Sequence, residues 1–304
     1  MRDDGGLIVT LHKVGTILQV APMIGGSITR YTDEEGGVDW LRPASAAGIA
    51  ARDPEAMACF PLVPFSNRVR HGSFTFDGRI IHLGPPVPGP HAEHGHGWKA
   101  AWTIVERSAD RLVIEYRHAA DLWPFAYRAR QAFVLARDRL TITLEILNEA
   151  GQAMPVGIGL HPYFPRTPRT RLTAGIQGMW RTDDEVMPVE LVDPPPGSDP
   201  RAGIVVAATP LDTAFTGWDG RAVIDWPERA ATLTMTARGP LGFLVVYTPP
   251  GEDFFCGEPV SNCTDAFNLA AEGRVDTGMI VLAPGQTTRA SVTFSTTFRQ
   301  GGQQ

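Results

Sequence analysis

Apolar and polar side chains alternate with a period of two along most of this chain. In residues 140–147, leucine or isoleucine occupies every second position and threonine or glutamate fills most of the positions between. Because successive side chains of a strand point to opposite faces, this pattern predicts a strand with one buried and one exposed face. The period of 3.6 residues that marks amphipathic helices is hard to find. The pattern therefore predicts an all-β protein.

The predicted strands form hairpins from the beginning of the chain. Residues 7–11 and 16–20 flank a turn at Val14-Gly15, and residues 27–31 form a third strand. Further strands are predicted at residues 102–106, 112–117, 128–135, 140–147, 231–237, 243–248 and 288–298. Sheets with one apolar face need a second layer to cover that face, so we expect two packed sheets.

The longest break in the pattern is the proline-rich segment 193–200. Its prolines cannot donate to a strand ladder, which predicts a surface loop. The segment is open to interpretation as a domain linker. We favour a loop within one domain that spans residues 1–304, because the strand pattern is similar on both sides.

Composition narrows the class of partner. The net charge is −6 and no lysine- or arginine-rich run occurs, so nucleic acid is not an expected partner. The three cysteines are an odd number at spacings that fit neither a disulfide framework nor a zinc site, which suggests a reducing compartment. The acidic start lacks the pattern of a signal peptide, and no apolar stretch reaches about twenty residues. We expect a cytoplasmic protein that does not bind a membrane.

Two residues are candidates for acid–base chemistry. Glu258 follows two apolar runs, where a buried strand is expected to emerge, and partial burial raises the pKa of a carboxyl group toward neutrality. The alternative is an ordinary glutamate at a strand end, paired with an arginine. His161 is expected to end an apolar strand and is held extended by Pro162. Its alternative is a core histidine bonded to a backbone carbonyl.

Other polar residues suit the recognition of hydroxyl groups. The amide of Asn67 and the guanidinium of Arg68 offer donors and an acceptor in a fixed geometry, although Arg68 also suits a local ion pair. Asp212 is a hydroxyl acceptor or a turn residue. His94 and His96 lie among glycines with no third metal ligand at a recognisable spacing, so we expect no metal and favour contact with a sugar or acid–base work.

These segments together resemble a known family. The motifs NRVRHGSF (67–74), HGHGW (94–98), GLHPYF (159–164), LDTAF (211–215) and CGEP (256–259) occur in the order and approximate spacing of the aldose 1-epimerases of the galactose mutarotase type. The resemblance covers nearly the whole chain. It implies a large antiparallel β-sandwich of two sheets, the galactose mutarotase-like supersandwich, with the sugar in an open cleft on one sheet.

The resemblance also implies residue roles. Glu258 is similar to the general base of the family and His161 to its general acid, and the implied sugar-binding residues are Asn67, Arg68, His94 and Asp212. His96 is a further candidate because it lies two residues from His94, which the motif match favours. Asp253 is a candidate because galactose-specific members often carry glutamine there, whereas an ionised carboxylate accepts hydrogen bonds without donating them.

The implied activity is that of an aldose 1-epimerase, or mutarotase, which interconverts the α and β anomers of a free aldose without cofactor or metal. Galactose or glucose is the default substrate, and we expect a monomer or a homodimer. A hexose-6-phosphate mutarotase would need cationic side chains for the phosphate, for which Arg70, His71 and Lys99 are the candidates. A non-catalytic carbohydrate-binding protein would not need Glu258 and His161 together. A glycoside hydrolase would need a second carboxylate beside Glu258.

Overall fold

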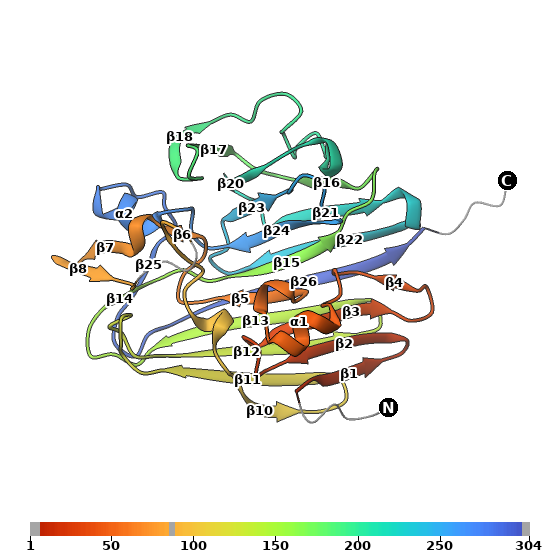
Figure 1. Ribbon diagram of the computed structural model, residues 1–304, viewed down its shortest axis with the longest axis horizontal. Coiled ribbons are helices and arrows are strands. Elements are labelled where there is room, and N and C mark those ends of the chain that lie inside the picture. The colour runs from red at the N-terminus through yellow and green to blue at the C-terminus, as the bar shows by residue number, and fades with distance from the viewer. Residues whose placement is uncertain (1–6, 85–88, 300–304) are drawn as a thin grey trace.

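The computed structural model describes residues 7–84 and 89–299 of the chain, and two large β-sheets form its framework (Figure 1). The larger sheet has eleven strands, of which β4 (Val38–Asp39) pairs with β3 outside the main path. In spatial order, the others are β1 (Val9–Lys13), β2 (Thr16–Ala21), β3 (Ser27–Asp33), β5 (Cys59–Leu62), β15 (Gly159–Pro165), β24 (Phe254–Val260), β23 (Phe243–Tyr247), β20 (Asp212–Thr216), β17 (Gly178–Thr182) and β18 (Pro188–Val192).

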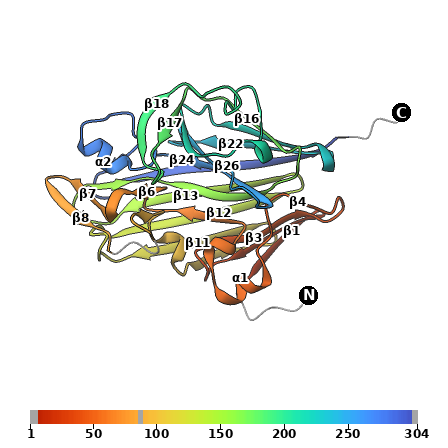
Figure 2. The same ribbon diagram turned by 45° about the horizontal axis from the view of Figure 1, so that its top comes forward.

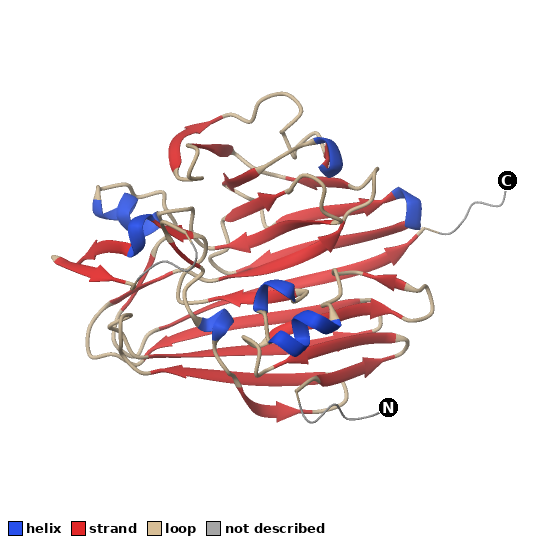
Figure 3. Cartoon of the chain, in the orientation of Figure 1, coloured by secondary structure: helices blue, strands red, loops and turns tan. Residues whose placement is uncertain are grey.

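The second sheet has nine strands, and the remaining elements are short (Figure 3). Its order is β10 (Thr103–Arg107), β11 (Arg111–His118), β12 (Tyr127–Ala136), β13 (Arg139–Asn148), β26 (Thr287–Phe298), β22 (Ala231–Arg238), β21 (Arg221–Trp226), β16 (Arg171–Ala174) and β19 (Ile204–Val205). Three further strand pairs are β6 (Arg68–Val69) with β9 (Ala92–Glu93), β7 (Ser73–Phe76) with β8 (Arg79–His82), and β14 (Met154–Val156) with β25 (Ile280–Leu282). The helical segments are α1 (Ala46–Ala51), α2 (Ala266–Ala271) and the single 3₁₀ turns η1 (Pro54–Ala56), η2 (Arg70–Gly72), η3 (Gly97–Lys99), η4 (Val206–Ala208) and η5 (Pro227–Arg229).

The prediction of an all-β sandwich is confirmed. The long strands of the two sheets run in roughly the same direction in both views (Figures 1 and 2). Apolar side chains from both sheets share one buried core, in which Phe164 of β15 and Phe294 of β26 have ring centroids 6.0 Å apart. The segment 193–200 connects β18 of the larger sheet to β19 of the smaller one, and each sheet contains strands from before and after it.

The alternation of side chains gives the larger sheet two different faces. In β15, Leu160 and Phe164 point into the shared core, whereas Tyr163 belongs to a separate apolar cluster on the opposite face. In β24, Phe255 points into the core and Cys256 lies on that opposite face. His161 and Glu258 have the same parity as Tyr163 and Cys256, so the strand period places both on the outer face of the larger sheet.

Glu258 and His161 lie inside their strands, so the expectation that each marks a strand end was wrong. Prolines follow both residues, yet β15 and β24 continue past them. The ladder between the two strands pairs Gly159 with Val260 and Tyr163 with Cys256, without a regular pair at the positions between. The register is the same on both sides of this gap, and because proline has no N–H to donate, the ladder lacks hydrogen bonds there without a shift of the strands.

Two further expectations concern the cysteines and membrane-spanning segments. Cys59, Cys256 and Cys263 are all free and buried. In the described part of the chain, no helix combines the length and the apolar character that crossing a bilayer would require.

Candidate active site

A polar cavity of about 250 Å³ opens on the outer face of the larger sheet. It lies over the adjacent strands β5, β15, β24, β23 and β20, with side chains from β6 and β9 at its side. The lining residues are Glu55, Phe60, Asn67, Arg68, Glu93, His94, Trp98, His161, Tyr163, Asp212, Val245, Tyr247 and Glu258. The cavity thus gathers six of the eight residues that the sequence nominated.

The sheet register sets the floor of this cavity. Glu258 of β24 pairs with Val245 of β23, and His161 of β15 pairs with Phe60 of β5. Because β15 and β24 are neighbours, these four residues form one row across the strands. A parallel row holds Asp212, which pairs with Tyr247. Side chains in such rows lie on one face of the sheet, close enough to interact directly.

The imidazole of His161 and the carboxyl of Glu258 are in contact. His161 Nε2 lies 3.3 Å from Glu258 Oε1, and the two residues are only 7% and 3% exposed. Burial, together with the nearby cations Arg42 and Arg68, lowers the pKa of His161 from 6.5 to about 3. Burial also raises the pKa of Glu258 well above its usual value, helped by the neighbouring Asp212. Both shifts favour a neutral carboxylic acid beside a neutral imidazole.

Each residue of the pair also has one polar side-chain atom without a hydrogen-bond partner among the described residues. These atoms are Glu258 Oε2 and His161 Nδ1, and both are buried. Buried polar atoms in proteins are nearly always hydrogen-bonded. The pair at the floor of the cavity therefore retains hydrogen-bonding capacity that the described residues do not use.

Aromatic contacts fix the orientation of the His161 ring. It stacks on Phe60 with a centroid distance of 4.5 Å and on Tyr163 at 4.8 Å. Phe60 in turn stacks on Trp98 at 5.0 Å. The guanidinium of Arg42 lies 4.1 Å from the centroid of the Tyr163 ring. These contacts leave the imidazole little freedom to rotate away from Glu258.

Arg68 supplies the positive charge of the cavity. Its Nε lies 2.8 Å from Glu93 Oε1, and its Nη2 lies 3.6 Å from Asp212 Oδ2. Arg68 pairs with Glu93 in the short β6–β9 ladder, which holds the guanidinium over the sheet. Burial raises the pKa of Asp212, and Arg68 opposes this shift. Arg68 is thus engaged by carboxylates on two sides, as its local ion-pair interpretation allowed, and still faces the cavity.

Asn67 and His94 hold each other in place. The backbone N–H of Asn67 donates to His94 Nδ1 at 3.1 Å, and the N–H of His94 donates to the Asn67 carbonyl at 2.9 Å. Both residues have a positive φ, 58° and 59°. Burial lowers the pKa of His94 well below 6.5, so its ring is neutral. Since Nδ1 accepts a hydrogen bond, Nε2 carries the ring proton and is a donor.

Comparison with known families shows which family the chain belongs to. The model of the family described as aldose 1-epimerase matches residues 8–295. The chain belongs to the aldose 1-epimerase family. It is 34% identical over 294 residues to the uncharacterized protein YphB of Escherichia coli K12, a match that covers 88% of this chain and 96% of that protein. The family resemblance read from the motifs is confirmed.

Solved structures agree with this assignment. A candidate aldose 1-epimerase from Escherichia coli K12 superposes with a TM-score of 0.87 and 30% identity, over 96% of this chain and 99% of that one. A galactose mutarotase-like protein from Clostridium acetobutylicum gives a TM-score of 0.86 over 96% of this chain and 95% of that one. At 18% identity, the second match shows a shared fold.

Two nominated residues lie outside the cavity of this aldose 1-epimerase family member. His96 Nε2 is 2.8 Å from the hydroxyl of Tyr127, a residue of the smaller sheet, and its ring lies 4.2 Å from that of His118. His94 and Gly95 both have positive φ, so the chain turns between His94 and His96 and their rings point in different directions. Asp253 immediately precedes β24, and its carbonyl accepts a hydrogen bond from the Arg166 N–H. The expectation that His96 and Asp253 face the sugar is corrected accordingly.

Several lining residues were not anticipated from the sequence. Pairing between β6 and β9 brings Glu93 to Arg68, and the strand rows bring Phe60, Tyr163 and Tyr247 to the floor. Tyr163 carried a weak signal, because it lies two residues from His161 on the same side of a strand. Glu93 carried none that distinguishes it from an ordinary surface glutamate.

One group of potential metal ligands occurs among the described residues. Atoms of His161, Cys256 and Glu258 lie within 4.8 Å of one another. A cysteine binds metal as the thiolate, and burial raises the pKa of the Cys256 thiol well above its usual value. The donor set of this family member is therefore better suited to proton transfer between His161 and Glu258 than to holding an ion.

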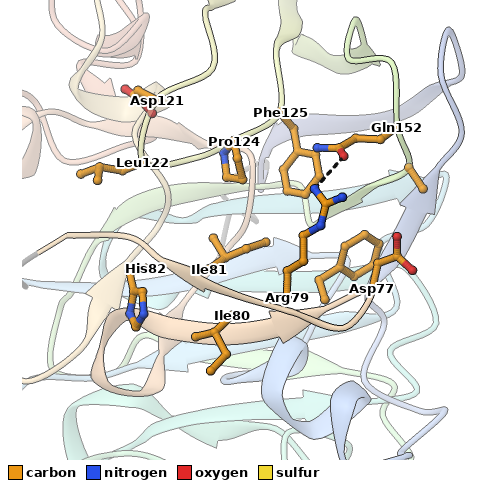
Figure 4. A pocket seen from close by; sticks show the side chains of 12 residues that line it. Asp77, Arg79, Ile80, Ile81, His82, Asp121, Leu122, Pro124, Phe125 and Gln152 are labelled. Carbon is orange, nitrogen blue, oxygen red and sulfur yellow. Dashed lines mark hydrogen bonds between the residues drawn. The ribbon is translucent and has the colours of Figure 1, made fainter.

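A larger cavity, of about 380 Å³, lies apart from the site between the β7–β8 hairpin and residues 121–125 (Figure 4). Ile81, Leu122 and Phe125 form much of its apolar wall, and Arg79 Nη1 donates to Gln152 Oε1 at 3.3 Å across it. Its titratable side chains are all exposed. It therefore offers no buried acid–base pair of the kind that Glu258 and His161 form.

Proposed function

We propose that this chain is an aldose 1-epimerase that interconverts the α and β anomers of a free aldose by general acid–base catalysis. The observation that carries the proposal is the contact between His161 and Glu258 on the floor of a polar cavity, with Arg68 and His94 at its side. A sugar-binding protein without catalysis has no need of a buried acid and base in contact. Membership of the family supports the same activity.

In the proposed reaction, the Glu258 carboxylate removes the proton of the anomeric hydroxyl while the His161 imidazolium protonates the ring oxygen O5. The electron pair of the O–H bond forms the C1 carbonyl, and the C1–O5 bond breaks with its pair moving to O5. Rotation about C1–C2 presents the other face of the aldehyde. The O5 hydroxyl then adds back to C1, returning one proton to His161 and taking one from Glu258.

The proton count explains why a neutral pair suits this chemistry. Ring opening leaves a protonated Glu258 and a neutral His161, the combination that burial favours. The carboxylate–imidazolium combination holds the same number of protons, because it differs by transfer of one proton across the 3.3 Å contact. Because burial also favours the neutral pair in the resting protein, the carboxylate–imidazolium form that starts the reaction lies above it in free energy and is reached by moving one proton from Glu258 to His161.

The charge of the cavity supports an unphosphorylated sugar. Its lining contains the carboxyl groups of Glu55, Glu93, Asp212 and Glu258 against the single guanidinium of Arg68. A phosphate group would be repelled by this arrangement.

The cations nominated for a phosphate lie elsewhere. Arg70 lies near three carboxylates, those of Asp183, Glu185 and Asp265. Lys99 Nζ lies 4.3 Å from the centroid of the Trp98 ring, and neither Lys99 nor His71 lines the cavity. These placements favour free hexoses, with glucose and galactose as the first sugars to test, over hexose 6-phosphates.

The test is polarimetry of freshly dissolved α-D-glucose and α-D-galactose, with anomer-exchange NMR for hexose 6-phosphates. We expect the wild type to accelerate mutarotation of a free sugar and the Glu258→Gln variant to have lost this activity while remaining folded. A Glu258→Gln variant near the wild-type rate would reject the proposed base. Sugar binding without faster mutarotation by the wild type would favour a carbohydrate-binding protein instead.

A further inference from the structure

A second cavity adjoins the candidate active site. It has a volume of about 350 Å³, within the range of roughly 300–1,000 Å³ that small-molecule sites occupy. Arg68 and Glu93 line both cavities, so the ion pair between them forms a shared wall. The other lining residues are Gly89, Pro90, His91, Asp184, Glu185 and Val186. We call this space the outer cavity.

The far wall of the outer cavity is a turn held in a defined conformation. Asp183 Oδ1 accepts hydrogen bonds from the N–H groups of Glu185 and Met187, at 3.0 and 2.9 Å. Arg70 joins this turn to the body of the protein, with Nη2 3.6 Å from Asp183 Oδ2 and Nε 3.6 Å from Asp265 Oδ2. Asp265 is buried, so the cation has a fixed anchor. The outer cavity is thus bounded by an ordered turn.

His91 gives the outer cavity an unpaired hydrogen-bond donor. The residue is only 5% exposed, and its Nδ1 accepts a hydrogen bond from the His71 N–H at 3.1 Å. Burial lowers the pKa of His91, so the ring is neutral and its proton lies on Nε2. Nε2 has no hydrogen-bond partner among the described residues; it faces Glu185 Oε2 at 3.7 Å, beyond hydrogen-bond distance. This gap is too short to admit another atom, so a ligand hydroxyl would bond to both groups from beside the pair, with the exposed Glu185 side chain displaced.

The chemistry of the lining selects the ligand. Asp184, Glu185 and Glu93 accept hydrogen bonds, His91 donates one, and Pro90 and Val186 add apolar surface. Hydroxyl groups both donate and accept, and a sugar ring also presents apolar C–H faces. Anionic ligands are disfavoured because Arg68 already pairs with Glu93 and the other charged side chains there are acidic.

From this arrangement we infer that the outer cavity binds a second sugar unit, so that the preferred substrate is a reducing disaccharide. The inference rests on the proposed function. The reducing aldose would occupy the cavity of the candidate active site, here called the inner cavity, with its anomeric hydroxyl at Glu258 and His161. The second unit would be attached through a hydroxyl other than the anomeric one, on the side of the aldose that faces Arg68 and Glu93. The inner cavity, of about 250 Å³, is too small to be a typical site for both units.

The test compares kcat/KM for mutarotation of maltose, lactose and melibiose with that of glucose, measured by anomer-exchange NMR. All three disaccharides carry glucose at the reducing end, so glucose is the matched single-unit substrate. At least one linkage is expected to have a KM below that of glucose. In the Glu185→Gln and His91→Gln variants, the ratio of disaccharide to glucose kcat/KM should fall by about threefold to tenfold, as expected for one lost hydrogen bond.

Glu190→Gln is the matched control, because Glu190 lies on the same hairpin, pairs with Arg181 and does not line the outer cavity. Glu185 is exposed, so its variant tests the inference even if His91→Gln does not fold. Two outcomes would overturn the outer-cavity assignment alone. In the first, the protein turns over glucose but no disaccharide has a lower KM. In the second, Glu185→Gln leaves the ratio of disaccharide to glucose kcat/KM unchanged. Failure to accelerate mutarotation of any of the four sugars would overturn the proposed function as well.

Discussion

The ring of Tyr163 stacks on the imidazole of His161, with centroids 4.8 Å apart and planes inclined by 29°. Tyr163 also packs against Arg42, whose guanidinium donates to the backbone carbonyls of Glu55 and Met57. The rigid contacts of Arg42 therefore extend through Tyr163 to the proposed general acid. Arg42 carries a charge as well, and this charge lowers the pKa of His161.

Removal of the Arg42 charge should change the pH profile. In Arg42→Met the pKa of His161 should rise, so the limb of the kcat/KM profile that His161 controls should move to higher pH. Arg42→Lys retains the positive charge and should stay closer to the wild type. Polarimetric rates over a pH series measure this. Equal profiles for Arg42→Met and the wild type would mean that Arg42 acts through packing alone; Arg30→Met, which removes an exposed arginine paired with Asp39, is the control.

Substitutions of the proposed acid and base should have non-additive effects on kcat. Single variants Glu258→Gln and His161→Gln should each lower kcat by about 10²–10⁴-fold, the usual contribution of positioned proton transfer. Because each residue acts through the proton of the other, the double variant should lose little beyond the worse single variant. Single-turnover anomer exchange followed by NMR would quantify the three rates. Fully multiplicative losses would argue against a concerted pair.

Substitutions at His94 and His96 should have sharply different effects on kinetics and stability. His94→Gln should raise the KM for a free aldose and lower kcat/KM by about tenfold, because it alters the Nε2 donor beside the cavity. His96→Leu should leave both constants within about twofold but destabilise the protein by roughly 1–3 kcal/mol, since the Tyr127 hydroxyl loses its buried partner. Kinetics and urea denaturation on the same two variants measure both effects. A larger kinetic loss from His96→Leu would return that residue to the site.

Glu258 should reduce stability at neutral pH. Its pKa is higher in the folded than in the unfolded chain, so the folded state binds more protons between the two values. Stability then falls as pH rises from the unfolded pKa of 4.5 through this window. Glu258→Gln removes the effect and should have a higher Tm than the wild type at pH 7 to 8, with the difference shrinking toward pH 4. Thermal unfolding at several pH values would show it; a difference independent of pH would contradict the assigned direction.

The fold was readable from the sequence because local alternation specifies strands. The segment 140–147 corresponds to the interior of β13, and its apolar positions are buried as the pattern requires. The prolines after His161 and Glu258 misled the prediction of strand ends, since the β15–β24 ladder continues in the same register past both. Periodicity alone gives no information about how two distant segments pair on either side of a proline.

The residues of the candidate site could be predicted from the sequence only in part. Motif resemblance nominated Glu258 and His161, and the sheet order then placed them together. Glu93 could not be found in this way, because its role depends on a two-residue ladder with Arg68. His96 could not be separated from His94 either, because the separation depends on positive φ angles at His94 and Gly95.

His161 and Glu258, the proposed acid and base, lie far apart in the sequence and meet only because β15 and β24 are neighbours near the middle of the larger sheet. A slip of one residue in the pairing of either strand would turn its side chain toward the apolar core, on the other side of the sheet. Recovery of mutarotase activity after denaturation would therefore report correct alignment of the two strands. A compact refolding product with misaligned strands would have no such activity.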